Sequence, residues 1–328
     1  MSNPIALVIG VSGQDGAYLA RHLLKNGFDV HGTSRDVSAN PMSKLQRLGI
    51  RDRVALHSVT LTDFRSVLQT LSRVQPDQVF NLAGQTSVGL SFAQPVETLD
   101  SIAMGTLNLL EAIRFVDRPI RFYNACSSEC FGNTGDLRAN EQTPFRPRSP
   151  YAVAKATTFW TVANYREAYG LFCCSGILSN HESPLRPERF VTQKIVRAAC
   201  RIADGQQKKL HLGNLDITRD WGWAEEYVAA MASMLQLERP EDFVVASGSS
   251  HTLEDFVSMA FRANGLDWTD HVVQDKSLLR PTDIACSRMD PSKAKRLMNW
   301  EAKMAMPEVV EEMVRLVRSQ QSGEENNP

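Results

Sequence analysis

The sequence predicts an α/β protein whose first part is a doubly wound parallel sheet and whose second part is smaller and mostly helical. Two observations support this prediction. Short apolar runs alternate with helical patterns through the first half of the 328-residue chain, which is the order of parallel strands joined by crossover helices. The first apolar run also ends in a glycine-rich turn that opens a helix, a connection typical of such sheets.

The elements of the first half follow from apolar runs and from the residues that break them. Ile5–Ile9 is predicted as a buried strand, and a helix over Gly16–Lys25 ends at Asn26-Gly27. The next strand covers Phe28–Thr33. Further strands are predicted over Val54–Val59, Gln78–Leu82, Ile120–Ala125 and Cys173–Leu178, and helices over Asp63–Arg73, Gly105–Phe115 and Tyr151–Tyr169.

After about residue 179 the pattern is less regular. Helices are predicted over Val191–Ala203, Ala224–Gln236, Leu253–Ala263 and Pro307–Arg318, and a short strand over Phe243–Ala246. We expect residues 1–178 to form a Rossmann-like domain to which residues 215–247 return. A ligand-binding part would cover residues 179–214 and 248–320, and residues 321–328 would form a flexible tail.

The composition indicates which binding partners and which cellular compartment to expect. With 36 basic and 37 acidic residues the net charge is -1, which gives no general affinity for nucleic acid or for a membrane surface. No apolar stretch approaches membrane-spanning length, and no N-terminal signal is visible. The six cysteines lack zinc-ribbon spacing. We therefore expect reduced thiols, no metal site and a cytoplasmic location.

The glycine-rich turn predicts a dinucleotide site. It has the spacing Gly-x-x-Gly-x-x-Gly, directly after the first strand and at the start of the first helix. Missing side chains allow a tight turn and close approach of a pyrophosphate, to which the helix end offers N–H groups. The residues expected to bind the cofactor here are Gly10, Ser12, Gly13, Gln14, Asp15 and Gly16.

The residue after the second strand bears on the choice between NADP and NAD. Arg35 stands where NAD-binding sites usually have an acid for the ribose 2′-hydroxyl, and an arginine suits a 2′-phosphate instead. NADP is therefore favoured as the cofactor. The alternative is a surface arginine that merely pairs with Asp36.

A tyrosine and a lysine lie one helical turn apart in the sequence. Ser149 is predicted as the N-cap of this helix, with Pro150 in its first turn. Tyr151 and Lys155 would then share a face. A lysine ammonium beside a phenol lowers the tyrosine pKa, so that the phenol can exchange a proton with a sugar hydroxyl. The alternative is a core tyrosine and a solvated lysine.

A serine pair followed by an acid lies about two dozen residues before that tyrosine. Ser127, Ser128 and Glu129 follow a predicted strand, and the carboxyl ends of such strands are where parallel sheets bind ligands. Glu129 could instead be an exposed loop carboxylate.

Taken together, these motifs resemble those of extended short-chain dehydrogenases/reductases and, within them, the GDP-mannose 4,6-dehydratase family. The resemblance runs from residue 5 to about residue 317. Its most specific blocks are Asn180-His181-Glu182-Ser183-Pro184 and Arg219-Asp220-Trp221-Gly222.

The resemblance implies a lyase that converts GDP-mannose to GDP-4-keto-6-deoxymannose with NADP retained. Tyr151 would take the C4 hydroxyl proton, and Lys155 would support it and hold the cofactor. Glu129 would remove the C5 proton, which the C4 ketone makes acidic. Ser127 would hydrogen-bond the C4 oxygen, with Ser128 in support.

The resemblance also implies binding residues. Further cofactor contacts would come from Leu61, Leu82, Ala83, Gly84, Gln85, Thr86, Lys155, His181 and Arg186. The GDP-sugar would be held by Thr86, Asn180, Lys194, Asn214, Arg219, Arg280 and Asp283. Family members form tetramers, so we expect a homodimer or homotetramer.

Some positions depart from the family pattern. They are Asp36, Thr60, Glu97 and Gln193, where the family has an arginine, an acid, a tyrosine and a basic residue. These departures concern cofactor and substrate affinity and the tetramer, and they leave the dehydratase residues in place.

Two other functions stay open from the sequence. A nucleotide-sugar epimerase or reductase of the same fold needs no base such as Glu129 for the C5 proton. A non-catalytic NADP-sensing protein would need neither Tyr151 nor Lys155, although this chain retains both.

Overall fold

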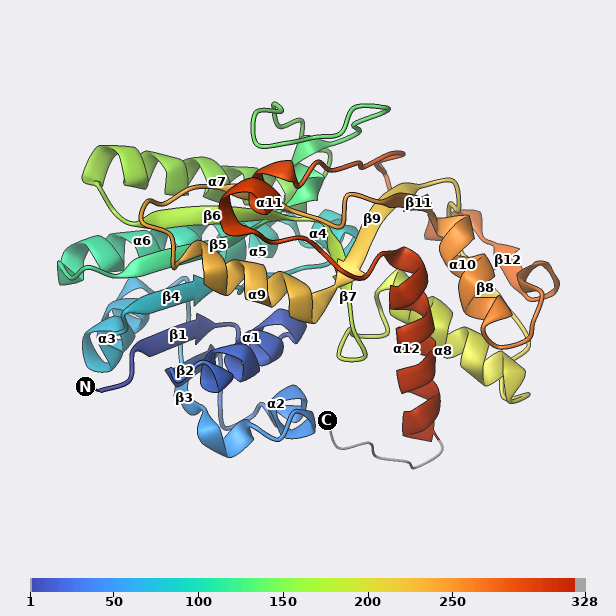
Figure 1. The fold of residues 1–328 in the computed structure, drawn as a ribbon, viewed down its shortest axis with the longest axis horizontal. Coiled ribbons are helices and arrows are strands. Elements are labelled where there is room, and N and C mark those ends of the chain that lie inside the picture. The colour runs from blue at the N-terminus through green and yellow to red at the C-terminus, as the bar shows by residue number, and fades with distance from the viewer. Residues whose placement is uncertain (1, 322–328) are drawn as a thin grey trace.

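The computed structural model describes residues 2–321, and at its centre lies a seven-stranded sheet in the order β10-β6-β5-β4-β1-β2-β3 (Figure 1). All six strand pairings are parallel, which confirms the predicted fold class. The strands are β1 (Ile5–Ile9), β2 (Asp29–Ser34), β3 (Ala55–Ser58), β4 (Gln78–Asn81), β5 (Arg121–Ser127), β6 (Cys173–Leu178) and β10 (Phe243–Val245).

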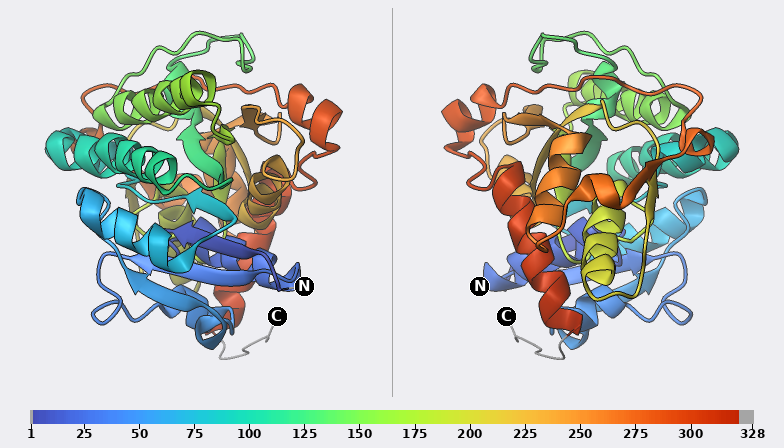
Figure 2. Two further views of the ribbon diagram at one scale, coloured as in Figure 1. Left: turned by 90° about the vertical axis from the view of Figure 1, so that its left-hand side faces the viewer. Right: turned by 90° about the vertical axis from the view of Figure 1, so that its right-hand side faces the viewer.

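The sheet is covered on both faces, as continuous apolar strands require. Along β1, Ala6 and Val8 pack against the layer of α1 (Gln14–Lys25) and α9 (Ala224–Met234). Leu7 and Ile9 point the other way, into the core beneath α3 (Phe64–Val74) and α6 (Gly105–Val116). α7 (Pro150–Tyr169) lies beside α6 on that second face (Figure 2).

The second part of the chain packs beside the sheet around its own apolar core (Figure 1). Three helices, α8 (Val191–Ala203), α10 (Leu253–Arg262) and α12 (Met306–Gln321), contact one another there. It also contains two small sheets that the sequence did not predict. Their strands are β7 (Asn180–Glu182), β9 (Thr218–Trp223) and β11 (Ser250–Thr252) in one, and β8 (Leu210–Leu212) and β12 (Val272–Gln274) in the other.

Most predicted elements are found within two residues of their predicted ends. The exception is α12, which was predicted over Pro307–Arg318 and ends three residues later, at Gln321. At the site, β5 was expected to end at Ala125 but continues to Ser127, because Cys126 and Ser127 pair with Ile177 and Leu178 of β6. Short elements were missed. These are the helices α2 (Ser43–Arg47), α4 (Val88–Ala93), α5 (Pro95–Leu99) and α11 (Ser292–Met298), the π-turn Asp100–Met104, and the 3-10 turns Arg51–Arg53, Ser128–Phe131, Trp268–Asp270 and Lys276–Leu278.

Three further expectations concern the C-terminal tail, membrane-spanning segments and the division into domains. The tail predicted over residues 321–328 lies outside the described residues from residue 322 on. No helix within residues 2–321 is long and apolar enough to cross a membrane. The division into a Rossmann-like domain and a ligand-binding part at residues 179–214 and 248–320 stays a prediction.

A buried polar network joins the start of α1 to β7, and so connects the two parts of the chain. Gln14 donates through Nε2 to the His181 carbonyl at 3.1 Å and accepts from the Ser183 hydroxyl at 2.8 Å. The His181 ring lies between the Asp15 carboxylate, 3.0 Å from Nε2, and the Ser179 carbonyl, 2.8 Å from Nδ1. Both ring nitrogens face acceptors, so the structure favours a charged imidazolium.

The two charges of this network stabilise each other. Burial would raise the pKa of Asp15, but the charge and hydrogen bond of His181 outweigh burial and lower the pKa to about 2. Burial would likewise lower the pKa of His181, but the Asp15 carboxylate raises it above the ordinary value. Both members of the pair are therefore ionised at pH values between the lowered pKa of Asp15 and the raised pKa of His181.

We predict that the Asp15–His181 pair makes stability depend on pH at both ends of this range. The Asp15 contribution is present above its ordinary pKa of 3.8 and is lost as the pH falls toward 2. The His181 contribution is present below 6.5 and is lost as the pH rises through the raised pKa. In urea titrations, Asp15→Asn should lower the free energy of unfolding between these limits by about 2 kcal/mol.

An exposed control is Asp52→Asn, in the 3-10 turn after α2. It should leave the pH profile of the unfolding free energy unchanged. If Asp15→Asn also left the pH dependence of the unfolding free energy unchanged, the Asp15–His181 pair would not stabilise the fold.

Candidate active site

A cavity of about 340 Å³ lies where the carboxyl ends of the sheet strands meet the second part of the chain. Strand β5, the turn after it and helix α7 supply one wall, through Ser127, Glu129, Tyr151 and Lys155. Carboxyl ends of parallel strands are the usual ligand-binding edge of such sheets. The structure therefore brings four of the five predicted catalytic residues to one cavity, and leaves Ser128 buried outside its wall.

The turn after β5 positions the serine and the acid. Ser127 is the last residue of β5, and its hydroxyl accepts a hydrogen bond of 3.3 Å from the Glu129 backbone N–H at the start of the Ser128–Phe131 turn. This bond caps the short helix and directs the two side chains to the same cavity. Gly132 ends the turn at a φ of 70°, a left-handed conformation that favours glycine.

The start of α7 positions the tyrosine and the lysine. Ser149 caps the helix by accepting from the Ala152 backbone N–H at 3.1 Å, which confirms the predicted N-cap. Tyr151 and Lys155 are both buried, and the Tyr151 phenol hydrogen-bonds to the Ser127 hydroxyl. The Tyr151 phenol and the Ser127 hydroxyl therefore lie next to each other on the wall of the cavity.

The predicted effect of Lys155 on Tyr151 is wrong in this structure. Burial raises the pKa of the Tyr151 phenol well above its ordinary value, and only the Ser127 hydrogen bond opposes this. The Lys155 ammonium donates instead to the Ala125 carbonyl at 2.7 Å and lies 5.9 Å from the centroid of the Tyr151 ring. Burial lowers the pKa of Lys155 itself.

Glu129 shares one buried guanidinium with a second acid. The Nε atom of Arg219 lies 3.9 Å from the Glu129 carboxylate, and its Nη2 lies 3.3 Å from Asp283. The Nη1 atom of Arg219 donates to the backbone carbonyls of Thr218 and Ile284, at 3.0 and 2.7 Å. Contacts within the chain therefore occupy most of the N–H donors of Arg219. Its guanidinium is held in place on β9 and forms a long ion pair with the Glu129 carboxylate.

The environment of Glu129 suits a general base. Burial raises the pKa of its carboxyl group, while the positive charges of Arg219 and Arg280 oppose this rise. A carboxylate with a raised pKa accepts a proton more readily near neutral pH than an exposed glutamate does. The side chain of Glu129 is 13% exposed, so it reaches the cavity despite its burial.

The glycine-rich turn fits the phosphates of a dinucleotide. Gly10 has a φ of 86°, and a Cβ on Gly16 would lie 2.7 Å from the Val11 Cα. Gly13 caps α1 without any side-chain bond, so that side chains do not cover the first N–H groups of the helix. The tight turn, the close packing of α1 against it and the uncovered N–H groups of α1 match what a pyrophosphate site needs.

The predicted cofactor residues divide into two sets. Those that line the cavity are Asp15, Leu82, Thr86, Lys155, His181 and Arg186. Those outside the cavity wall are Gly10, Ser12, Gly13, Gln14, Gly16, Arg35, Leu61, Ala83, Gly84 and Gln85. The side chain of Arg35 is 87% exposed and lies 3.8 Å from Glu97, while Asp36 accepts bonds from Ser38 and Ala39. The alternative pairing of Arg35 with Asp36 is not found.

All seven predicted substrate residues line the cavity. They are Thr86, Asn180, Lys194, Asn214, Arg219, Arg280 and Asp283. They come from the sheet edge, β7, α8, β9 and the loops after β8 and β12, so that segments far apart in the sequence meet at one site. The Lys194 ammonium donates to the His211 carbonyl at 2.7 Å.

The sequence missed a group of residues on the second wall. They are Ser179, Glu182, Arg189, Phe190, Val191, Thr192, Leu212, Gly213, Ile217, Leu253, Leu278 and Leu279. Several follow directly on the Asn180-His181 block, so the wall continues where that motif ends. The apolar members carry no chemical signature by which a sequence could identify them.

Comparisons with known proteins show the family of this chain. The family model described as GDP-mannose 4,6 dehydratase matches residues 7–313. GDP-mannose 4,6 dehydratase 1 of Arabidopsis thaliana is 47% identical over 320 residues, which cover 94% of this chain and 88% of that protein. The GDP-mannose 4,6-dehydratase of Vibrio cholerae is 41% identical over 343 residues, which cover 94% of this chain and 92% of that protein.

Solved structures share the whole fold. UDP-glucose 4-epimerase of Thermus thermophilus, in complex with NAD, superimposes with a TM-score of 0.84 at 25% identity, over 96% of this chain and 99% of that chain. dTDP-glucose 4,6-dehydratase of Bacillus anthracis reaches 0.83 at 19% identity, over 97% and 98% of the two chains. The match of a dehydratase model to nearly the whole chain decides between such relatives, and the chain belongs to the GDP-mannose 4,6-dehydratase family.

Proposed function

We propose that this protein is a lyase that dehydrates GDP-mannose to GDP-4-keto-6-deoxymannose. The observation that carries the proposal is the buried Glu129 carboxylate, which lies in one cavity with the Tyr151 phenol and the Ser127 hydroxyl. An epimerase or reductase needs no such base, whereas loss of water across C5 and C6 does. The full-length similarity to dehydratases of plant and bacterial origin supports the same reaction.

The residues on the cavity wall would move protons in a fixed order. Tyr151 takes the proton of the C4 hydroxyl as a phenolate, so its phenol must first ionise against the effect of its burial. Ser127 donates to the C4 oxygen, where negative charge develops. Once C4 is a ketone, the C5 proton is acidic, and Glu129 removes it and transfers it to the C6 hydroxyl, which leaves as water. When hydride reaches C6, C5 regains one solvent-exchangeable proton, which balances the proton that Tyr151 took. Lys155 holds the sugar end of the cofactor, and Ser128 supports the turn that carries Ser127.

A nicotinamide cofactor, which we propose to be NADP, would supply the hydride chemistry, with hydride leaving C4 and returning to C6. The glycine turn and the cavity-lining Asp15, His181 and Arg186 would hold it. Arg35, which is exposed directly after β2 and lies 3.8 Å from Glu97, supports NADP over NAD because a guanidinium suits the 2′-phosphate.

The GDP part of the substrate would meet the cations on the far wall. Lys194 and Arg280 suit the diphosphate, and Arg219 adds its positive charge from the wall. Asp283 would accept from the ribose hydroxyls, with Thr86, Asn180 and Asn214 as the remaining polar contacts. In this proposal the segments 179–214 and 248–320 form the substrate part, and the protein is cytoplasmic.

We predict that Glu129→Gln abolishes dehydration. The amide keeps the shape of the side chain but cannot take the C5 proton, so the rate should fall by at least about a hundredfold. The measurement is mass spectrometry of GDP-mannose after incubation with the cofactor-loaded protein, where loss of one water marks the product.

Glu167→Gln, on the exposed side of α7, is the matched control and should retain the wild-type rate. Unchanged dehydration by Glu129→Gln would refute the assignment of the base. A substrate that gains two hydrogens, or changes only its stereochemistry, would point to the reductase or the epimerase. Bound cofactor without turnover of any nucleotide sugar would favour the NADP-sensing protein.

We also predict where activity is lost in acid. Glu129 must be unprotonated to act, and burial raises its pKa above the ordinary 4.5. The value of kcat/KM should therefore fall with decreasing pH around a midpoint above 4.5, while circular dichroism shows a folded protein. A midpoint at or below that value would mean that another group limits the reaction.

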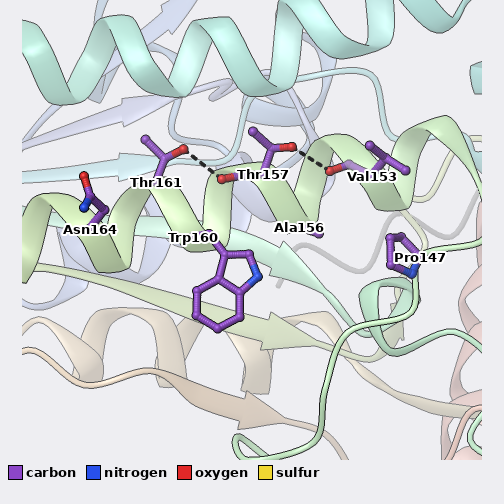
Figure 3. A pocket seen from close by; sticks show the side chains of 7 residues that line it. All are labelled: Pro147, Val153, Ala156, Thr157, Trp160, Thr161 and Asn164. Carbon is purple, nitrogen blue, oxygen red and sulfur yellow. Dashed lines mark hydrogen bonds between the residues drawn. The ribbon is translucent and has the colours of Figure 1, made fainter.

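We further propose that two copies of the chain associate through the outer face of α7. An open groove of about 570 Å³ lies there, beside a Trp160 side chain that is 62% exposed (Figure 3). Thr157 and Thr161 bond their hydroxyls to Val153 and Thr157 carbonyls of the same helix, so that they present methyl groups outward. In a twofold dimer the same face of each copy meets the other, so that each exposed Trp160 could be buried against the partner's α7.

We predict that Trp160→Glu disrupts this assembly, because it places a charge in the apolar centre of the interface. Light scattering after size-exclusion chromatography should give a dimer or tetramer for the wild type and a smaller species for the variant. Leu297→Glu, which adds the same charge on the exposed face of α11, should not change the mass. A monomeric wild type would rule out the interface.

A further inference from the structure

Basic side chains from two distant segments form a cluster that reaches the glycine-rich turn through Lys44 and the cavity wall through Arg189. Lys44 and Arg47 belong to α2, which follows the second strand, while Arg189 precedes α8 and Arg197 lies within it. The Lys44 ammonium donates to the Ser12 carbonyl of the turn at 3.1 Å. Arg189 lines the cavity together with Asp15. The cluster therefore combines the cofactor end of the sheet with the first helix of the substrate part.

The positive charge of this cluster is not balanced within the chain. Among the side chains of residues 2–320, no carboxylate lies within 4.0 Å of any of its four cationic groups, Lys44, Arg47, Arg189 and Arg197. The nearest acids in sequence have other partners, since Glu188 pairs with Arg201 at 2.6 Å and Glu182 accepts from Thr192 at 2.7 Å.

The members of the cluster act on one another. Burial lowers the pKa of Lys44, and the charges of Arg189 and Arg47 lower it further. Like charges held together in this way store repulsion that an anion between them would relieve. A phosphate group is the anion that both lysine and arginine bind best.

We propose that Lys44 and Arg189 bind a phosphate of the dinucleotide cofactor from its two sides and so hold the cofactor in the cavity. This inference rests on the proposed function, in which hydride returns to the substrate and the cofactor has no need to leave between turnovers. Lys44 contributes from the Rossmann-like sheet and Arg189 from the substrate part. The bound phosphate would then link the two parts of the chain.

The position of the cluster favours the cofactor over the phosphates of the substrate. Lys44 bonds to Ser12, within the turn that fits a dinucleotide pyrophosphate. The cations proposed for the substrate, Lys194, Arg219 and Arg280, lie on other elements, and Arg219 and Arg280 both face Asp283. The cluster could bind either the 2′-phosphate or the diphosphate of the cofactor, since both are phosphate anions. NADP carries both groups and NAD carries only the diphosphate, so a comparison of the two cofactors distinguishes them.

The test measures the dissociation constants of NADP, NAD and GDP for the full chain by isothermal titration calorimetry. Lys44→Met and Arg189→Met should each weaken cofactor binding by about tenfold, since each removes a charge-assisted hydrogen bond. Lys44→Arg keeps the charge and should bind close to the wild type. Lys25→Met removes one charge at the exposed far end of α1 and should change nothing. GDP binding should be the same in all variants.

The outcomes separate the two proposals. Weaker binding of NADP alone places the contact at the 2′-phosphate, and weaker binding of both cofactors places it at the diphosphate; either result supports the inference. Normal cofactor binding by both methionine variants would overturn it, as would an equal loss of GDP binding. A wild-type protein that binds neither NADP nor NAD would instead overturn the proposed function itself.

Discussion

The buried guanidinium of Arg219 is the interaction on which the site depends. A carboxylate as buried as that of Glu129 is costly unless a positive charge lies close to it, and Arg219 supplies that charge from β9. The same guanidinium reaches Asp283 and two backbone carbonyls. Arg219 therefore connects the turn after β5 to the second part of the chain, so that the Glu129 carboxylate has its partner only when both parts have folded together.

The balance at Glu129 explains how a glutamate can serve as a base there. Full neutralisation by the arginine would hold the pKa of Glu129 low and make the carboxylate a poor proton acceptor. Burial without the arginine would leave it protonated and unreactive. At 3.9 Å from Nε and with Asp283 competing for the same cation, Glu129 keeps a raised pKa while remaining charge-paired. The proposed reaction requires such an intermediate state.

Local signals in the sequence were sufficient to predict the sheet and the place of four candidate catalytic residues. β1 is an uninterrupted apolar run, and Ser149 caps α7 as its position before Pro150 predicted. Tyr151, Lys155, Ser127 and Glu129 lie close together because helical spacing and parallel strand order bring them there. The family resemblance extended this to all seven substrate residues, although they come from separate elements.

Long-range packing accounts for what the sequence did not reveal. β9 has the polar sequence Thr218–Trp223, and it becomes a strand only because β7 and β11 pair with it from distant parts of the chain. The Lys155 ammonium bonds to the Ala125 carbonyl, a choice set by the end of β5 and not by helical spacing. Arg189 has no motif of its own, and its place on the cavity wall follows from the packing of the second part.

The most direct test of the central claim is the fate of hydrogen during the reaction in deuterium oxide. Removal of the C5 proton by Glu129 and return of the C4 hydrogen to C6 predict a product with one solvent deuterium at C5 and none in the new methyl group. Magnetic resonance of the isolated ketosugar locates the label. Deuterium in the methyl group, or unexchanged hydrogen at C5, would contradict the account.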